Sequence, residues 1–178
     1  LHGAGREAPY YSLVNGCMSA PCMHAGGLAA SSQASASWVA ELTPAGVRHW
    51  LTGTAAPCCS LFKPVAVDDP LDLGPAATSE ADDRSLWWRG ERLHRLAVRN
   101  PQALYPHFAP ERDELEAAWR AAPPCPADAF AQADEHLARW TRAVADVRVG
   151  DVRPAVVRRY WSRRDRVSGF ADLQPTAV

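Results

Sequence analysis

The sequence lacks the long apolar runs that membrane-spanning helices require. No hydrophobic stretch in its 178 residues approaches the ~20 residues that cross a bilayer as a helix. No basic and apolar leader of the secretory type opens it either. We therefore expect no membrane partner. The first residue is Leu1 and not Met, so we expect this chain to be a processed product or a fragment.

Lysine is nearly absent, and neither sign of charge dominates. Lys63 is the single lysine, and all other basic residues except histidine are arginine. The 19 Lys and Arg against 20 Asp and Glu leave a formal net charge of −1. Such a balance provides no global attraction to nucleic acid or to an anionic surface. The arginines of residues 158–166 are typical of a solvated helix face, and we expect no nucleic-acid partner.

Cysteine is scarce, and its count is odd. The five cysteines are Cys17, Cys22, Cys58, Cys59 and Cys125. An odd count argues against a secreted disulfide framework and favours a reducing, cytoplasmic location. Four of them can be drawn with His24 as a zinc site, but the spacing does not match paired C-x-x-C knuckles. We therefore expect no metal, and no pattern points to a cofactor.

The first third of the chain has the signals of strands. Residues 34–42 alternate in part, which places Ala36, Trp38, Ala40 and Leu42 on one strand face. Residues 43–46 (Thr-Pro-Ala-Gly) supply turn chemistry, and residues 47–52 predict a second strand. The result is a β-hairpin with a loop of about four residues. A third extended stretch covers residues 59–67, in which Pro64 favours a sheet edge.

The rest of the chain favours helices. Residues 68–83 carry six acidic and no basic residues, which is typical of a solvated linker. Helices are predicted over 85–99, from Pro110 to before Pro123, over 126–148 and over 152–167. In the third, apolar residues step by three and four and form one stripe. In the last, we expect Val152, Val156, Tyr160 and Val167 to face inward.

Strands followed by helices predict an α+β fold with three parts along the chain. These are a strand-rich part over 1–67, an acidic linker over 68–84 and a helical part over 85–178.

Short motifs of common enzymes are missing. There is no G-x-G-x-x-G, P-loop, H-E-x-x-H or G-x-S-x-G. Cys22 and His24 would share one face of a strand, so a Cys–His nucleophile pair is conceivable, and two buried neighbours are the simpler interpretation. Ser32 and Gln33 offer polar groups near the same segment and could bind a substrate or satisfy a turn.

Three segments together resemble the secernins, a branch of the C69 dipeptidase-like N-terminal-nucleophile (Ntn) hydrolases. The first runs Cys-Met-His-Ala-Gly-Gly from Cys22, with Ser32-Gln33 after it. The second runs His-Trp-Leu-Thr-Gly-Thr-Ala-Ala-Pro-Cys from His49, and leads into residues 60–65 (Ser-Leu-Phe-Lys-Pro-Val). The third is Leu-Trp-Trp-Arg-Gly-Glu-Arg-Leu-His-Arg over residues 86–95. The resemblance covers about residues 17–100.

The resemblance implies an αββα sandwich, of which this chain would be the C-terminal portion. It also implies hydrolysis of dipeptides or other amides by an N-terminal Cys, whose α-amino group acts as the base. Cys22 and Cys58 are internal, so the resemblance assigns no catalytic residue here and implies that the nucleophile lies upstream of Leu1. The chain would then be inactive alone. Cys22, His24, Ser32 and Gln33 would line the substrate side.

Two other interpretations remain open. The chain could be a non-catalytic binding or scaffold relative of the family, which would lack the nucleophile altogether. It could also be a Cys–His hydrolase built around Cys22 and His24. A peptide or small amide substrate is the partner expected if the hydrolase is complete, and the sequence does not fix an oligomeric state.

Overall fold

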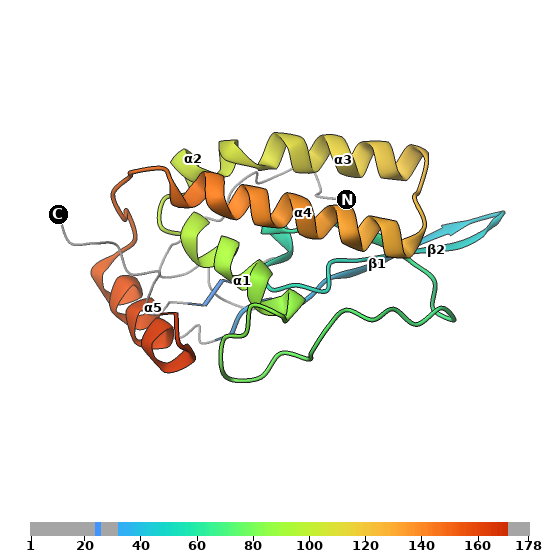
Figure 1. Ribbon diagram of the computed structural model, residues 1–178. Coiled ribbons are helices and arrows are strands. Elements are labelled where there is room, and N and C mark those ends of the chain that lie inside the picture. The colour runs from blue at the N-terminus through green and yellow to red at the C-terminus, as the bar shows by residue number, and fades with distance from the viewer. Residues whose placement is uncertain (1–23, 26–31, 171–178) are drawn as a thin grey trace.

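The computed structural model describes residues 24–25 and 32–170 (Figure 1). Its elements run in the order β1 (Trp38–Thr43), β2 (Gly46–Leu51), the 3₁₀ turn η1 (Pro57–Cys59), β3 (Lys63–Val65), α1 (Leu86–Ala97), α2 (Pro101–Leu104), the 3₁₀ turn η2 (Tyr105–His107), α3 (Ala109–Ala121), α4 (Pro126–Ala145) and α5 (Ala155–Ser168). Strands come first and helices follow, so the chain is an α+β protein, as its sequence predicts.

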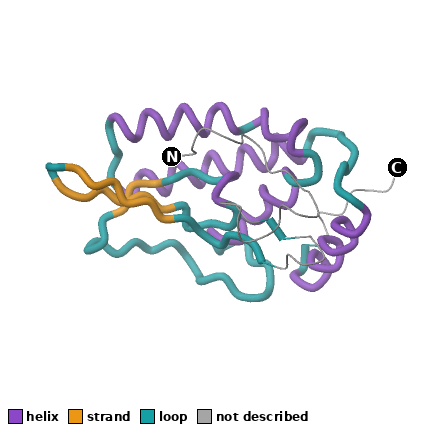
Figure 2. Tube along the Cα trace, turned by 180° about the vertical axis from the view of Figure 1, so that it is seen from behind, coloured by secondary structure: helices purple, strands orange, loops and turns teal. Residues whose placement is uncertain are grey.

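The three strands form one antiparallel sheet in the order β1-β2-β3. Thr43 pairs with Gly46, so the hairpin closes over the two residues between them, a shorter loop than predicted. Gly46 has a φ of 133°, which L side chains rarely adopt. The hairpin projects away from the helices (Figure 2). The predicted common face of β1 is exposed to solvent: Trp38 is 63% and Leu42 79% exposed.

The third strand is shorter than the predicted stretch over 59–67. Residues 57–59 form the turn η1 instead, so the extended backbone is confined to Lys63–Val65. Pro64 pairs with Trp50 on β2 and lies on an outer strand of the sheet, as expected for a residue that has no N–H to donate.

The helices α3 and α4 lie over one side of the sheet, α1 packs against α4, and together the three helices enclose the main core (Figure 1). The helix α4 contacts both α1 and β3. Its apolar stripe is confirmed, because the inward side chains are all buried: Phe130, Ala133, Leu137, Trp140 and Val144. The indole of Trp140 also donates a 2.7 Å hydrogen bond to Glu111 Oε2, which ties α4 to α3.

The predicted inward face of the last helix is wrong. Val152, Val156 and Val167 are exposed, whereas Val157 and Trp161 are buried. Of the predicted residues, only Tyr160 is partly buried and packs against this inner face. The physical reason is that the helix begins only at Ala155, and the large indole at position 161 sets which face packs inward. The spacing of the valines alone therefore predicts a buried face that is shifted by one residue from the observed one.

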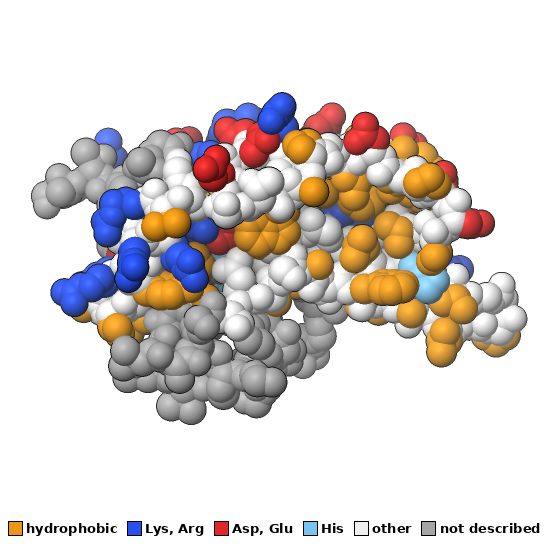
Figure 3. Space-filling view, turned by 90° about the horizontal axis from the view of Figure 1, so that it is seen from below, with side chains coloured by type: hydrophobic (Ala, Val, Ile, Leu, Met, Phe, Trp, Pro, Cys, Tyr) orange, Lys and Arg blue, Asp and Glu red, His pale blue; other side chains and the backbone are white. Residues whose placement is uncertain are grey.

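The outer face of α5 is basic. Basic side chains gather at the end of the molecule where this helix lies (Figure 3). The arginines of this helix at positions 158, 159, 163, 164 and 166 are all exposed. The run of arginines is therefore a solvated helix face, as its sequence predicts.

Between β3 and α1 the backbone over 66–85 has neither helix nor strand. Most of this segment is exposed, but Leu71 and Leu73 pack against the core. The indole of Trp88 donates a 3.2 Å hydrogen bond to the Thr78 carbonyl, which holds the segment against α1. Among the helices of the described residues, none is long and apolar enough to cross a membrane.

Candidate functional site

A group of polar side chains meets between η1, α1 and the segments at residues 24 and 33. We call it the thiol–histidine cluster. Most of its side chains are buried, and those of Cys58 and Gln33 are partly exposed. Burying polar side chains costs free energy that hydrogen bonds must offset, so such a concentration of them marks a candidate site. Its members are His24, Gln33, Cys58, Glu91, His94 and Tyr105.

A continuous chain of contacts runs through the cluster from a thiol to a carboxylate. Cys58 Sγ lies 3.3 Å from His24 Nε2. His24 Nδ1 lies 2.9 Å from His94 Nε2. His94 Nδ1 lies 2.9 Å from Glu91 Oε2. Two imidazoles therefore separate the thiol from the carboxylate, and each ring uses both of its nitrogens in the chain.

The ionised Glu91 fixes the direction of these hydrogen bonds. A carboxylate can only accept, so His94 Nδ1 must donate to it. In the tautomer with a single proton, on Nδ1, His94 accepts at Nε2 from His24 Nδ1, which leaves His24 Nε2 as an acceptor facing the thiol of Cys58. The S–H group donates to this nitrogen. Each His thus has a defined tautomer, and His24 is placed to take the proton of Cys58.

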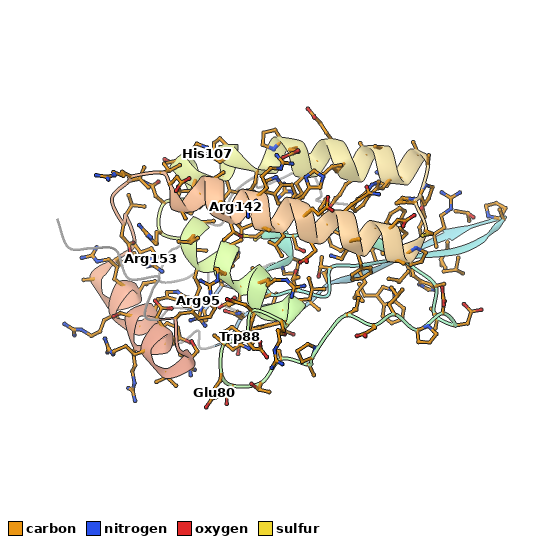
Figure 4. The ribbon with its side chains drawn as sticks, viewed as in Figure 1. Glu80, Trp88, Arg95, His107, Arg142 and Arg153 are labelled. Atoms are coloured by element: carbon orange, nitrogen blue, oxygen red, sulfur yellow. The ribbon has the colours of Figure 1, made fainter. Side chains whose placement is uncertain are left out.

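The ionised state of Glu91 has a clear electrostatic cause. Complete burial opposes it, but His94 and Arg95 outweigh burial and hold the pKa of Glu91 below its ordinary value. Arg95 Nε donates to Glu91 Oε1 over 2.7 Å, and Gln33 Nε2 donates to Oε2 over 3.0 Å. The side chain of Arg95 extends from α1 toward α5 (Figure 4), where it also donates to Asp165 over 2.8 Å.

Local backbone geometry presents Cys58 to the cluster. Ala56 has a φ of 46° and is the only non-glycine residue in the described ranges with a left-handed backbone. Such a conformation costs about 1–2 kcal/mol for a residue with a Cβ. Pro57 follows and begins the 3₁₀ turn that carries Cys58. The guanidinium of Arg112 donates to the Cys58 carbonyl and anchors the turn from α3.

Tyr105 lies beside the same thiol from η2. Its hydroxyl is 3.1 Å from Cys58 Sγ and 2.9 Å from Cys59 Sγ. Burial, together with the neighbouring charges of Cys58 and Cys59 when they ionise, raises the pKa of Tyr105 well above its ordinary value. The phenol therefore keeps its proton and can donate it to a sulfur as a hydrogen bond.

The helix α5 holds the two imidazoles in place. Ala25, directly after His24, packs on Val157 and Trp161. The Trp161 ring meets the His94 ring edge to face, with centroids 5.6 Å apart. The buried face of α5 therefore fixes both the segment at residue 24 and the ring on α1, which explains how two histidines 70 positions apart come together.

Two of the four predicted substrate-side residues belong to the cluster. His24 contacts Cys58 and His94, and Gln33 binds Glu91. Ser32 is exposed. Cys22 lies outside the described residues, so its predicted pairing with His24 stays a prediction.

Sequence reasoning missed Cys58, Glu91, His94 and Tyr105 as members of the site. One signal could have found Glu91 and His94. Glu91, His94 and Arg95 stand three and four positions apart on a helix whose neighbouring positions 93, 96 and 97 are apolar, so these polar residues fall on the buried face. Tyr105 has no such signal, since it follows a short helix and its contacts with Cys58 and Cys59 join segments that are distant in sequence.

Among the residues that the structure describes, no group of three or more His, Cys, Asp and Glu side chains has the arrangement of a metal site. Comparisons of the chain with models of protein families, with curated proteins and with solved structures find no match.

Proposed function

We propose that this chain forms part of the active centre of a secernin-like, C69-type Ntn hydrolase that cleaves dipeptides or other amides. One observation carries the proposal: each of the three segments of the resemblance contributes to the thiol–histidine cluster. The first segment supplies His24 and Gln33, the second Cys58, and the third Glu91 and His94. The three segments that resemble the family are therefore joined to one another by hydrogen bonds between their polar side chains.

In this proposal the nucleophile is not Cys58, the cysteine of the cluster. An enzyme of this type uses an N-terminal Cys with a free α-amino group, which an internal residue such as Cys58 does not have. The chain would therefore be inactive alone. His24 and Gln33 would orient the substrate, while Glu91 and Arg95 hold them. The sheet β1–β3 would belong to one of the two stacked sheets of an αββα sandwich.

The geometry also favours a second candidate, in which Cys58 itself is the nucleophile. His24 Nε2 takes the thiol proton, and the thiolate attacks the carbonyl carbon of an amide. The C–N bond breaks as His24 returns the proton to the leaving amine, and water then hydrolyses the thioester. The observation behind this candidate is the fixed direction of the hydrogen bonds from Cys58 to Glu91.

One experiment separates the two candidates. The product made by the native cell is purified, its N-terminal residue is determined, and its hydrolysis of a dipeptide panel is compared with that of residues 1–178 alone. Activity confined to a product with an N-terminal Cys supports the first candidate. Activity of residues 1–178 that is lost in C58S and kept in C125S supports the second. Hydrolysis by neither protein overturns both.

A pair of histidine variants then tests the role of the cluster in whichever protein is active. We expect H24A to lower kcat/KM by about 100-fold, which is within the range for a positioned acid–base group. The matched control is H107A, since His107 is exposed on η2 and outside the cluster (Figure 4). Equal activity of the two variants would remove His24 from the mechanism.

A further inference from the structure

Two neighbouring thiols share one hydroxyl group in the core of the site. Cys58 Sγ and Cys59 Sγ lie 3.9 Å apart, and the Tyr105 hydroxyl contacts both. Cys58 is partly exposed and Cys59 is buried. Cys125 is exposed at the start of α4, where its sulfur accepts from the Asp128 N–H, and it has no part in this pair. The pair therefore combines a partly exposed cysteine with a buried one.

The surroundings favour the thiolate form of Cys58. His24 Nε2 faces the thiol and can take its proton. The Tyr105 hydroxyl can then donate to the resulting negative sulfur. The guanidinium of Arg112 is bound to the Cys58 carbonyl and also pairs with Asp113 over 2.7 Å, so it fixes the position of the turn without adding much net charge there. The thiolate, and not the thiol, is the species that peroxides oxidise.

We infer that Cys58 and Cys59 form a peroxide-reactive dithiol that closes to a disulfide between neighbouring residues. The Cys58 thiolate attacks hydrogen peroxide, the O–O bond breaks, and sulfenic acid and water form once the departing hydroxide is protonated. The Cys59 thiol then attacks the sulfenyl sulfur, and a second water leaves with its proton. One peroxide oxidises two thiols to one disulfide, and the balance requires no further reactant.

The disulfide formed in this way is easily reduced. Adjacent Cα atoms lie about 3.8 Å apart across a trans peptide. Disulfides normally need about 4.4–6.8 Å between these atoms, so a bond between neighbours is strained. Strained disulfides have more oxidising potentials and behave as labile ones. The modification is therefore reversible by small thiols, and it does not depend on whether the site hydrolyses amides.

Peptide mapping tests the inference directly. Trypsin cuts after Arg48 and Arg84 and does not cut the Lys63–Pro64 bond, so residues 49–84 form one peptide whose only cysteines are Cys58 and Cys59. The whole chain is treated with hydrogen peroxide, quenched in acid, unfolded, alkylated and digested. We expect this peptide to be two hydrogens lighter and to take up no alkylating agent. If dithiothreitol is added after the peroxide and before the alkylation, both cysteines should be alkylated again.

Three variants separate the roles of the two thiols and of the tyrosine hydroxyl in the oxidation. C59S should lose the internal disulfide and leave a sulfenic acid on Cys58 that dimedone traps. C125S, the matched control, should behave as the wild type. Y105F keeps the ring and removes the hydroxyl, and we expect it to slow the oxidation severalfold. Circular dichroism of each variant checks that its fold is kept.

Two outcomes overturn the inference. One is an unaltered, fully alkylated 49–84 peptide at a peroxide dose that oxidises free glutathione. The other is oxidation without the internal bond, either as sulfinic acid at Cys58 or as a cross-link to the 7–48 peptide that carries Cys17 and Cys22. Because the readout is mass and not turnover, failure of the hydrolase proposal leaves this test unaffected.

Discussion

The ammonium nitrogen of Lys63 lies 2.6 Å from the carbonyl oxygen of Thr52 and donates a hydrogen bond to it inside the core. It also donates to the Leu61 carbonyl over 2.7 Å. The single lysine of the chain is thus almost completely buried, at 1% exposure. Burial lowers its pKa to about 7, although Glu116 and Asp134 attract the charged form and oppose this shift.

We expect Lys63 to make the protein more stable as the pH rises above about 7. The folded protein releases this proton near pH 7, whereas the unfolded chain keeps it up to an ordinary pKa of 10.5. In that window the unfolded state binds more protons, so the free energy of unfolding rises by at most about 1.4 kcal/mol per pH unit. Urea unfolding of the wild type and of K63M between about pH 6 and pH 9 measures this pH dependence of the free energy of unfolding. Parallel pH profiles of the two proteins would contradict the prediction.

The buried carboxylate of Glu91 should be essential for folding stability. E91Q removes one of the two carboxylates that pair with the buried Arg95 and leaves only Asp165, and breaking a buried pair costs up to about 3–5 kcal/mol. D82N is the matched control, because the Asp82–Arg84 pair lies at the surface and should contribute little that can be measured. Denaturant unfolding of both variants checks the contrast, and equal losses would refute it.

Glu91 also predicts how stability changes in acid. Its pKa in the folded protein is held below the ordinary 4.5 because His94 and Arg95 outweigh its burial. Its contribution is therefore present above about pH 4.5 and is lost as the pH falls through the lowered value. Acid unfolding should be shallower in E91Q than in the wild type. Identical acid profiles would mean that other groups govern the transition.

A close contact between α1 and the loop after β2 should tolerate no added methyl group. A Cβ built on Gly90 would lie 2.6 Å from Thr54 Cβ. We expect G90A to destabilise the protein by about 1–3 kcal/mol, the usual cost of overpacking. G150A is the control, since a Cβ on Gly150 meets nothing within 4 Å. Thermal unfolding compares the two, and a stable G90A would show that the contact can relax.

The buried face of α5 can be tested with two neighbouring valines. V157A should cost about 1.5–3 kcal/mol, because Val157 is buried against Ala25 and Trp161. V156A removes the same two methyl groups from a side chain that is 37% exposed, and we expect a clearly smaller loss. The urea midpoints of the two variants measure these losses. A larger loss in V156A than in V157A would contradict the observed buried face.

Much of the fold follows from local signals. The turn chemistry at residues 43–46 and the alternation around it predict the hairpin β1–β2, and the prolines at 110 and 126 predict where α3 and α4 begin. The face of α5 does not follow, because exposed valines at regular spacing imitate a buried stripe. Only the partners of Trp161, which are distant in sequence, show which side packs inward.

The site follows from the sequence only in part. His24 and Gln33 are expected at the site because their segment resembles the family, and small and polar residues are frequent in that segment. Their partners Cys58 and Glu91 are 34 and 58 positions away. Such contacts depend on how the helices pack against the sheet. They could not be predicted, because patterns in a single sequence indicate local geometry alone.

The separation between His24 and His94 has a consequence for the order of events in folding. Because these residues and Cys58 come from distant segments, the hydrogen-bonded chain can close only after long loops have been ordered, which is a slow kind of step. During synthesis the thiol leaves the ribosome well before α1 and α5. Its partner base therefore becomes fixed only when α1 and α5 dock.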